Sequence, residues 1–171
     1  MSRTPRWFAI RFVILLLLGN VLMVVPAFDA AVLTPWTELN AKGSARLASL
    51  IGLRAAADGT ILRAEAAGID VRQGCNGFHA LLIFACAVLA CPVSLPRRLL
   101  GLLLGTVVIL GCNLVRLVNL LAVAKYAPGH LELFHVYIWQ TLIVILALAT
   151  FIGWGTLIAR GQTPVQPISA E

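Results

Sequence analysis

Charged residues are scarce in this chain. Asp, Glu, Lys and Arg make up 12% of its 171 residues, about half of the roughly 25% that is usual in soluble domains. Hydrophobic residues make up 60%, and the mean hydropathy is +0.95. Several apolar runs approach the ~20 residues needed to cross a bilayer. These features exclude an ordinary soluble domain and predict a single polytopic membrane domain over residues 1–171.

The chain also lacks the patterns of several common site types. Three of its four cysteines lie within apolar runs, where cysteine usually packs as a small hydrophobe. There is no CxxC or Cys/His zinc spacing and no Ser-His-Asp or metal-hydrolase motif. The net charge is +6, but no basic cluster is interleaved with aromatic residues. We therefore predict no disulfide framework, no metal or other cofactor, and no nucleic-acid partner.

The apolar runs predict an all-α, polytopic transmembrane bundle of about four spans. The first run follows Arg3, Arg6 and Arg11, so it could be a cleavable signal peptide. A retained helix fits better, because the run is long and no clean A-x-A cleavage site follows it. The predicted spans are about 8–26, 76–93, 99–121 and 134–158, and the tail at 161–171 is predicted to be disordered.

The segment 27–74 is the only long stretch predicted outside the lipid. Thr34-Pro35 is typical of a helix start, with Thr34 as the N-cap, and Gly52 of a helix end. An amphipathic helix lying on the outer surface of the membrane is predicted between them, with a re-entrant segment as the alternative. Its apolar face is expected to consist of Leu33, Trp36, Leu39, Leu47, Leu50 and Ile51. Asp58-Gly59 is a turn signal and predicts a small hairpin before Cys75.

The distribution of arginine predicts the orientation. Six arginines lie in the segments 1–11, 93–98 and 159–171, whereas six Lys or Arg are spread over the much longer segments 27–74 and 122–133. The density and the three arginines before the first span place both termini in the cytoplasm. We therefore expect a multi-pass membrane protein.

Three polar residues are expected at one depth on the outer, periplasmic side. Cys75 opens the second span and His135 opens the last. Arg116 lies about 25 Å along a helix that begins at Leu99, at 1.5 Å per residue, near the outer boundary of a ~30 Å hydrocarbon core. Because the spans alternate in direction, the three residues reach the same level in either orientation of the bundle.

Each of the three residues also has an ordinary structural explanation. Cys75 could pack, Arg116 could extend to the lipid headgroups, and His135 could be an interfacial residue beside Tyr137 and Trp139. However, Gly74 and Gly77 flank Cys75 and leave room for a substrate backbone. Asn113 lies one turn before Arg116 on the same face, which favours a face directed into the bundle.

Together, these residue types supply the chemistry of acyl transfer. A nearby cation favours the thiolate form of cysteine, imidazole can transfer the proton of a leaving amine, and a guanidinium can hold a carbonyl or an oxyanion. His79 lies one turn after Cys75 and could orient the thiol, bind a metal or pack. His130 competes with His135 for the role of acid and base.

The sequence resembles the exosortase/archaeosortase membrane transpeptidases over about residues 70–155. The resemblance rests on Gly74-Cys75-Asn76-Gly77, on Asn113-Leu-Val-Arg116 and on His135, which match the cysteine, arginine and histidine of that family in order and spacing. The short length and the Cys-Asn-Gly form are most similar to the exosortase H branch. Members often have Ser or Thr where Asn76 stands, and many have eight spans.

The resemblance implies a membrane-embedded cysteine protease or transpeptidase that acts through a thioester. Its expected substrates are exported proteins whose C-terminal sorting signal combines a short motif of the IPTLxxWG type, a transmembrane helix and a basic cluster. Cys75, Arg116 and His135 would be catalytic, with Asn113, Asn76 and His79 accessory or substrate-orienting. The alternative hypothesis is a small membrane protein that binds or transports a metal ion through Cys75, His79 and His135, a ligand set suited to Zn or Cu.

Overall fold

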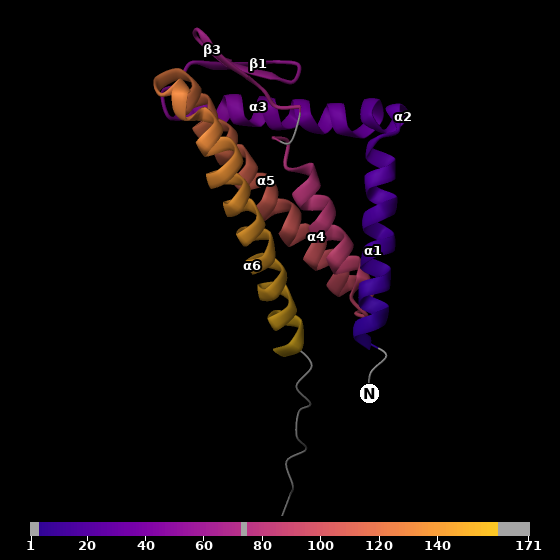
Figure 1. Cartoon of the computed structure of the whole chain (residues 1–171). Coiled ribbons are helices and arrows are strands. Elements are labelled where there is room, and N and C mark those ends of the chain that lie inside the picture. Colours follow the sequence, from indigo (N-terminus) through magenta and orange to yellow (C-terminus); the bar gives the residue numbers. More distant parts are fainter. Residues whose placement is uncertain (1–3, 73–74, 161–171) are drawn as a thin grey trace, which may run out of the picture.

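The structure is a computed structural model that describes residues 4–72 and 75–160. It consists of a bundle of apolar helices, capped at one end by a crossing helix and a small sheet (Figure 1). The chain begins and ends its described part at the opposite end of the bundle. The tail predicted to be disordered lies outside the described residues.

Four helices form the bundle: α1 (Thr4–Met23), α4 (Phe78–Ala90), α5 (Leu95–Tyr126) and α6 (Trp139–Arg160). In the described part of the chain, three helical stretches are long and apolar enough to cross a membrane, namely Arg6–Met23, Leu95–Tyr126 and Pro128–Arg160. With 13 residues, α4 is about 20 Å long, shorter than the hydrocarbon core. The predicted helical membrane bundle is confirmed.

A nearly continuous helical stretch runs across the capped end of the bundle in Figure 1. It begins at Pro26 in α2 (Pro26–Phe28), continues through the π-helical turn η1 (Asp29–Leu33) and becomes α3 (Thr34–Leu50). The predicted N-cap at Thr34 is wrong, because Leu33 and Thr34 both have right-handed helical backbone angles and Thr34 makes no capping bond. Pro35 instead lies in the first turn of α3.

The end of α3 agrees with the prediction from Gly52. This residue has a φ of +84°, in the left-handed region that glycine adopts without strain. Its N–H donates to the Ser49 carbonyl at 3.2 Å, and the Leu53 N–H donates to the Ala48 carbonyl at 3.0 Å. This pair of bonds is a Schellman motif, which satisfies the last carbonyls of the helix.

The buried face of α3 differs from the predicted apolar face. Leu39, Leu50 and Ile51 are exposed, whereas small and polar residues pack against the bundle. Small side chains let helix backbones approach closely, so α3 uses them where it crosses α5. The buried residues of α3 are Thr37, Asn40, Ala41, Ser44, Ala45 and Ala48.

The segment after α3 forms an antiparallel sheet with the order β1 (Ala55–Asp58), β2 (Ile61–Ala64) and β3 (Ala67–Asp70). The sheet therefore has one strand more than the predicted hairpin. Asp58-Gly59 turns the chain between β1 and β2, and Gly59 has a φ of +57°. Leu62 and Val71 are fully buried under the sheet in one cluster with Leu117 and Leu121 of α5, so the sheet is anchored to the bundle.

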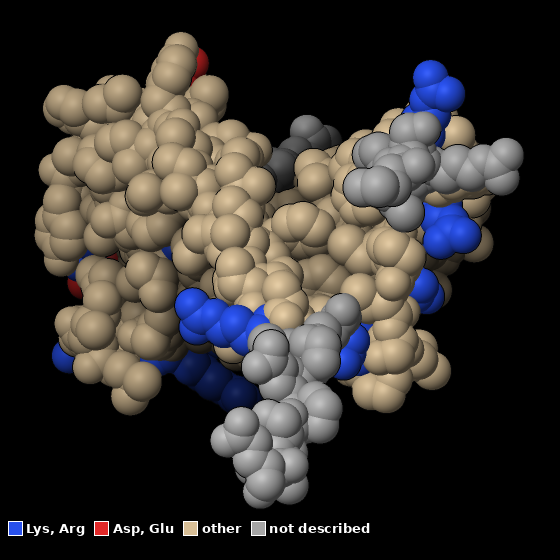
Figure 2. Space-filling view, turned by 90° about the horizontal axis from the view of Figure 1, so that it is seen from below, with Lys and Arg blue, Asp and Glu red and all other residues tan. Residues whose placement is uncertain are grey.

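Close contacts between glycine and aromatic rings hold the bundle below the sheet. A Cβ atom on Gly101 of α5 would lie 2.6 Å from the Trp154 ring of α6, and one on Gly105 would overlap the Phe84 ring of α4. The Trp154 indole also donates to the Arg97 carbonyl at 3.0 Å. Seen from below, Lys and Arg lie around this end, and few acidic side chains are visible, at the top and at the left edge (Figure 2).

Candidate active site

Cys75 lies in the short connection between β3 and α4, at the boundary of the sheet and the bundle. Its Sγ lies 2.7 Å from Nε2 of His135, although the two residues are 60 positions apart in sequence. Only 6% of Cys75 is exposed, and it belongs to the same buried cluster as Ala41 and Leu117. The thiol and the imidazole therefore meet in a largely dehydrated environment.

Arg116 approaches the same pair from α5. Its Nη2 lies 4.0 Å from Cys75 Sγ and donates to the His135 carbonyl at 3.5 Å. The residue is only 2% exposed, so it faces the interior of the bundle and does not extend to the headgroups. The structure thus brings Cys75, Arg116 and His135 together from three different elements.

His135 lies in a π-helical segment, η3 (Leu133–Ile138), which follows η2 (Pro128–His130) and leads into α6. The wider turn of a π-helix interrupts the regular 3.6-residue spacing, and such turns are frequent at functional sites. The following turn is held to α5 by the Trp139 indole, which donates to Asn119 Oδ1 at 2.8 Å. No feature of the sequence predicted this π-helical turn.

Asn76 attaches the cysteine segment to α3. Its Nδ2 donates to Thr37 Oγ1 at 3.1 Å, its Oδ1 accepts from the Phe78 N–H at 3.1 Å, and its carbonyl accepts from the Trp36 indole at 2.8 Å. Asn76 is only 7% exposed. The backbone directly after Cys75 is therefore fixed by three hydrogen bonds, so Asn76 holds the position of the thiol.

Gly77 has a structural role at the start of α4. Its φ of +69° is in the left-handed region, and a Cβ atom there would lie 3.0 Å from the Asn113 side chain. Gly77 therefore allows the turn into α4 and makes room for Asn113. Gly74, the other predicted flanking glycine, lies outside the described residues.

Asn113 belongs to a buried polar contact between α5 and α3. Its Nδ2 donates to Asn40 Oδ1 at 2.9 Å, and Asn40 Nδ2 donates to the Trp36 carbonyl at 2.9 Å. Both asparagines are fully buried. Trp36, Thr37 and Asn40 were not predicted as parts of the site. The signal for them in the sequence is the polar stripe of Thr37, Asn40 and Ser44 on an otherwise small-residue face.

Two buried polar atoms at the site have an unused hydrogen-bonding capacity. Among the described residues, neither Arg116 Nε nor Asn113 Oδ1 has a hydrogen-bond partner. A small cavity of about 30 Å³ beside Arg116 is also lined by Asn76, Gly77, His79 and Gln140. Arg116 therefore retains an unused N–H donor, and the small cavity that its side chain lines has room for a water molecule.

The surroundings of Cys75 act on its ionisation in opposite directions. Burial raises the pKa of the Cys75 thiol above its ordinary value, because the charged thiolate is poorly solvated there. The Arg116 guanidinium lowers this pKa, and the more distant Asp70 raises it. The net pKa is raised, and His135 Nε2, 2.7 Å from the sulfur, is placed to accept the thiol proton.

The other two histidines lie elsewhere. His79 is exposed at the start of α4 and lines a polar pocket of about 330 Å³ with Asn20, Arg72 and Asn76. His130 is exposed in η2. Within residues 4–72 and 75–160, no group of three or more His, Cys, Asp or Glu could hold a metal ion. The alternative ligand set of Cys75, His79 and His135 is therefore not assembled.

A family model described as transmembrane exosortase matches residues 3–153. The chain belongs to the transmembrane exosortase family. The match extends well beyond the segment 70–155 that carries the sequence resemblance and includes the first helix, the crossing helix and the sheet. No curated protein and no solved structure is significantly similar to the chain. Membership in this family and the long apolar helices make this exosortase a membrane protein.

Proposed function

We propose that this exosortase is a cysteine transpeptidase that cleaves a C-terminal sorting tail of exported proteins. The single observation that carries the proposal is the 2.7 Å separation of Cys75 Sγ and His135 Nε2, beside a buried guanidinium with an unused donor. A nucleophile within hydrogen-bond reach of a base is the arrangement that covalent catalysis requires. Arg116 adds a cation where negative charge develops.

The reaction would proceed in two half-reactions. Cys75 Sγ attacks the peptide carbonyl carbon while its proton passes to His135 Nε2, and Arg116 stabilises the resulting oxyanion. The C–N bond then breaks, and the proton moves from His135 to the departing amine, which leaves a thioester. An acceptor amine, or water, attacks the thioester and passes its proton to His135, and the thiol is restored.

The expected substrate carries the three-part tail that the family resemblance implies: a motif of the IPTLxxWG type, an apolar helix and a basic cluster. We place the site on the periplasmic side of a bacterial inner membrane, with both termini in the cytoplasm. This orientation is supported by the basic residues at the end of the bundle opposite the sheet (Figure 2) and by the preference of cytoplasmic loops for Lys and Arg.

Coexpression with a reporter that ends in such a tail tests the proposal. Wild-type protein should release the tail, and Cys75→Ala should abolish release while the protein still inserts into the membrane. Cys91→Ala is the matched control, because Cys91 follows the C-terminal end of α4 whereas Cys75 precedes the N-terminal end, and it should process normally. Tail release by Cys75→Ala would refute the mechanism.

The covalent intermediate provides a second test. When the wild-type protein acts on the reporter, rapid acid quenching should trap the reporter on the enzyme through a bond that hydroxylamine cleaves, as a thioester requires. The bond should map to Cys75. Cleavage without any such adduct, at every quenching time, would argue against a thioester and for direct attack by water.

A further inference from the structure

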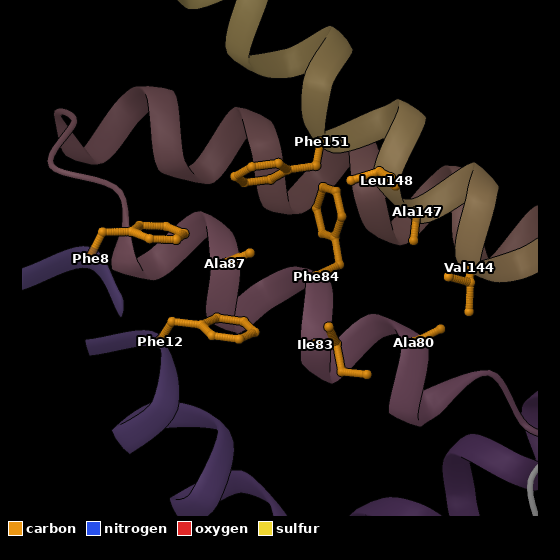
Figure 3. A pocket seen from close by; sticks show the side chains of 10 residues that line it. All are labelled: Phe8, Phe12, Ala80, Ile83, Phe84, Ala87, Val144, Ala147, Leu148 and Phe151. Carbon is orange, nitrogen blue, oxygen red and sulfur yellow. The ribbon is translucent and has the colours of Figure 1, made fainter. Parts of the chain in front are cut away.

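An apolar groove lies on the side of the bundle, between α1 and α6. It has a volume of about 350 Å³, and ten residues of three helices line it. Figure 3 shows Phe8 and Phe12 of α1 on one side, α4 as the floor, and Phe151 and Val144 of α6 on the other side. Both outer helices pack on α4 and stand apart from one another (Figure 1).

The lining residues repeat with helical spacing on two helices. On α4 they are Ala80, Ile83, Phe84 and Ala87, and on α6 they are Val144, Ala147, Leu148 and Phe151. Both sets follow the pattern i, i+3, i+4, i+7, which is the footprint of a straight apolar ridge about two turns long. Three of the eight residues are alanine, and small residues allow another helix to approach closely.

The groove leads to the polar site. Ala80 lines both the groove and the small cavity beside Arg116, and Ile143 of that cavity precedes Val144 of the groove. Ala80 is five residues after Cys75. A polypeptide helix that lay in the groove and continued past Ala80 would therefore reach the level of the sulfur. A lipid chain would fill the groove, but it would leave this connection to the site unused.

We propose that this groove binds the apolar transmembrane helix of the protein substrate, which packs as a fifth helix on α4 between α1 and α6. The volume suits a few side chains of such a helix, and the helix backbone would lie along the opening. This inference rests on the proposed function, because it assigns the site of one part of the sorting tail. In this arrangement, α1 and α6 flank the substrate helix and align the scissile peptide with Cys75.

Site-specific photo-crosslinking tests docking without requiring turnover. A benzophenone amino acid replaces Leu148 of the groove or, as a control, Ala149, which is exposed on the opposite face of α6. Both are placed in the Cys75→Ala variant and coexpressed with the tailed reporter. We expect reporter adducts at position 148 to exceed those at 149 by about tenfold. This ratio is equivalent to a difference of ~1.4 kcal/mol between the free energies of reporter contact at the two positions. Equal labelling, or adducts at 148 with lipid or a second copy only, would overturn the groove assignment.

Filling the groove gives an activity readout. Ala147→Trp should lower tail release by about tenfold through a raised KM, and Ala149→Trp should leave it unchanged. The alkylation rate of Cys75 should be equal in both variants, which shows that the catalytic site is intact. Normal release by Ala147→Trp would overturn the groove. Capture of the reporter at 148 without any release by the wild type would instead preserve the groove and refute the proposed reaction.

Discussion

The two ends of the bundle are held together by different interactions. Around Cys75, side-chain hydrogen bonds connect α3, α5 and the cysteine segment, through Asn40–Asn113 and Thr37–Asn76. At the other end, aromatic rings of α4 and α6 lie directly on glycines of α5, as Phe84 does on Gly105. Hydrogen bonds have directional geometry, so they fix positions, whereas close packing supplies contact area.

This difference indicates that the two ends of the bundle have different roles. Hydrogen bonds between transmembrane helices contribute on average only about 0.6 kcal/mol, so the polar end gains little stability from its network. Its benefit is a defined position for a sulfur that must lie within about 3 Å of an imidazole. The glycine–aromatic end provides the rigid support on which that position depends. Changes at the two ends should therefore affect different measurements.

The largest effect is expected at His135. His135→Ala removes the proton acceptor and donor, which lowers the rate of tail release by about 10²–10⁴-fold, without loss of thermal stability. His130→Ala is the control and should retain full activity, because His130 is exposed in η2. A larger loss in the His130 variant would reassign the base.

The next effect is expected at Gly105. Gly105→Val places a branched side chain against the Phe84 ring, so it should lower the free energy of unfolding by about 1–3 kcal/mol, measured by denaturation in mixed micelles. Gly111→Val is the matched control on the same helix, because a Cβ atom at Gly111 meets nothing within 4 Å. Equal stability of the two variants would contradict the conclusion that glycine–aromatic packing stabilises this end of the bundle.

A double-mutant cycle on Asn40 and Asn113 should give a smaller stability effect. The two alanine variants and their combination should yield a coupling energy of about 0.6–1.7 kcal/mol but a larger loss of activity than Gly105→Val causes. Asn20→Ala is the control, because the Asn20 side chain donates to the carbonyl one turn earlier in its own helix. Coupling without any loss of activity would show that the network is purely structural.

The smallest effect is expected in the pH dependence of thiol alkylation. Burial raises the pKa of the Cys75 thiol, and Arg116 lowers it. Because the thiolate is the reactive form, alkylation should increase as the pH rises through this raised pKa. Arg116→Gln removes the opposing charge and should move the midpoint to still higher pH. Arg97→Gln, at the far end of the bundle, should leave it unchanged; a downward shift for Arg116→Gln would contradict the assigned charge effect.

Much of the helical architecture was predictable from local sequence. The long apolar runs identified the membrane helices, and Gly52 and Asp58-Gly59 marked the end of α3 and the first turn of the sheet. The face of α3 that packs on the bundle was not predicted, because the predicted apolar face was assigned to the membrane surface. In this protein the partner of α3 is another helix at close distance, and small and polar residues such as Thr37 and Asn40 fit there.

The sequence alone determined that this chain enters a membrane and that Cys75, Arg116 and His135 reach one depth, because hydropathy and residue spacing set the height of each side chain along its helix. Only the tertiary structure decided that these side chains face each other. Rotation about a helix axis depends on packing with its neighbours, here on glycine contacts, on a π-helical turn before α6, and on Thr37 and Asn40 of a helix that the catalytic hypothesis had not included.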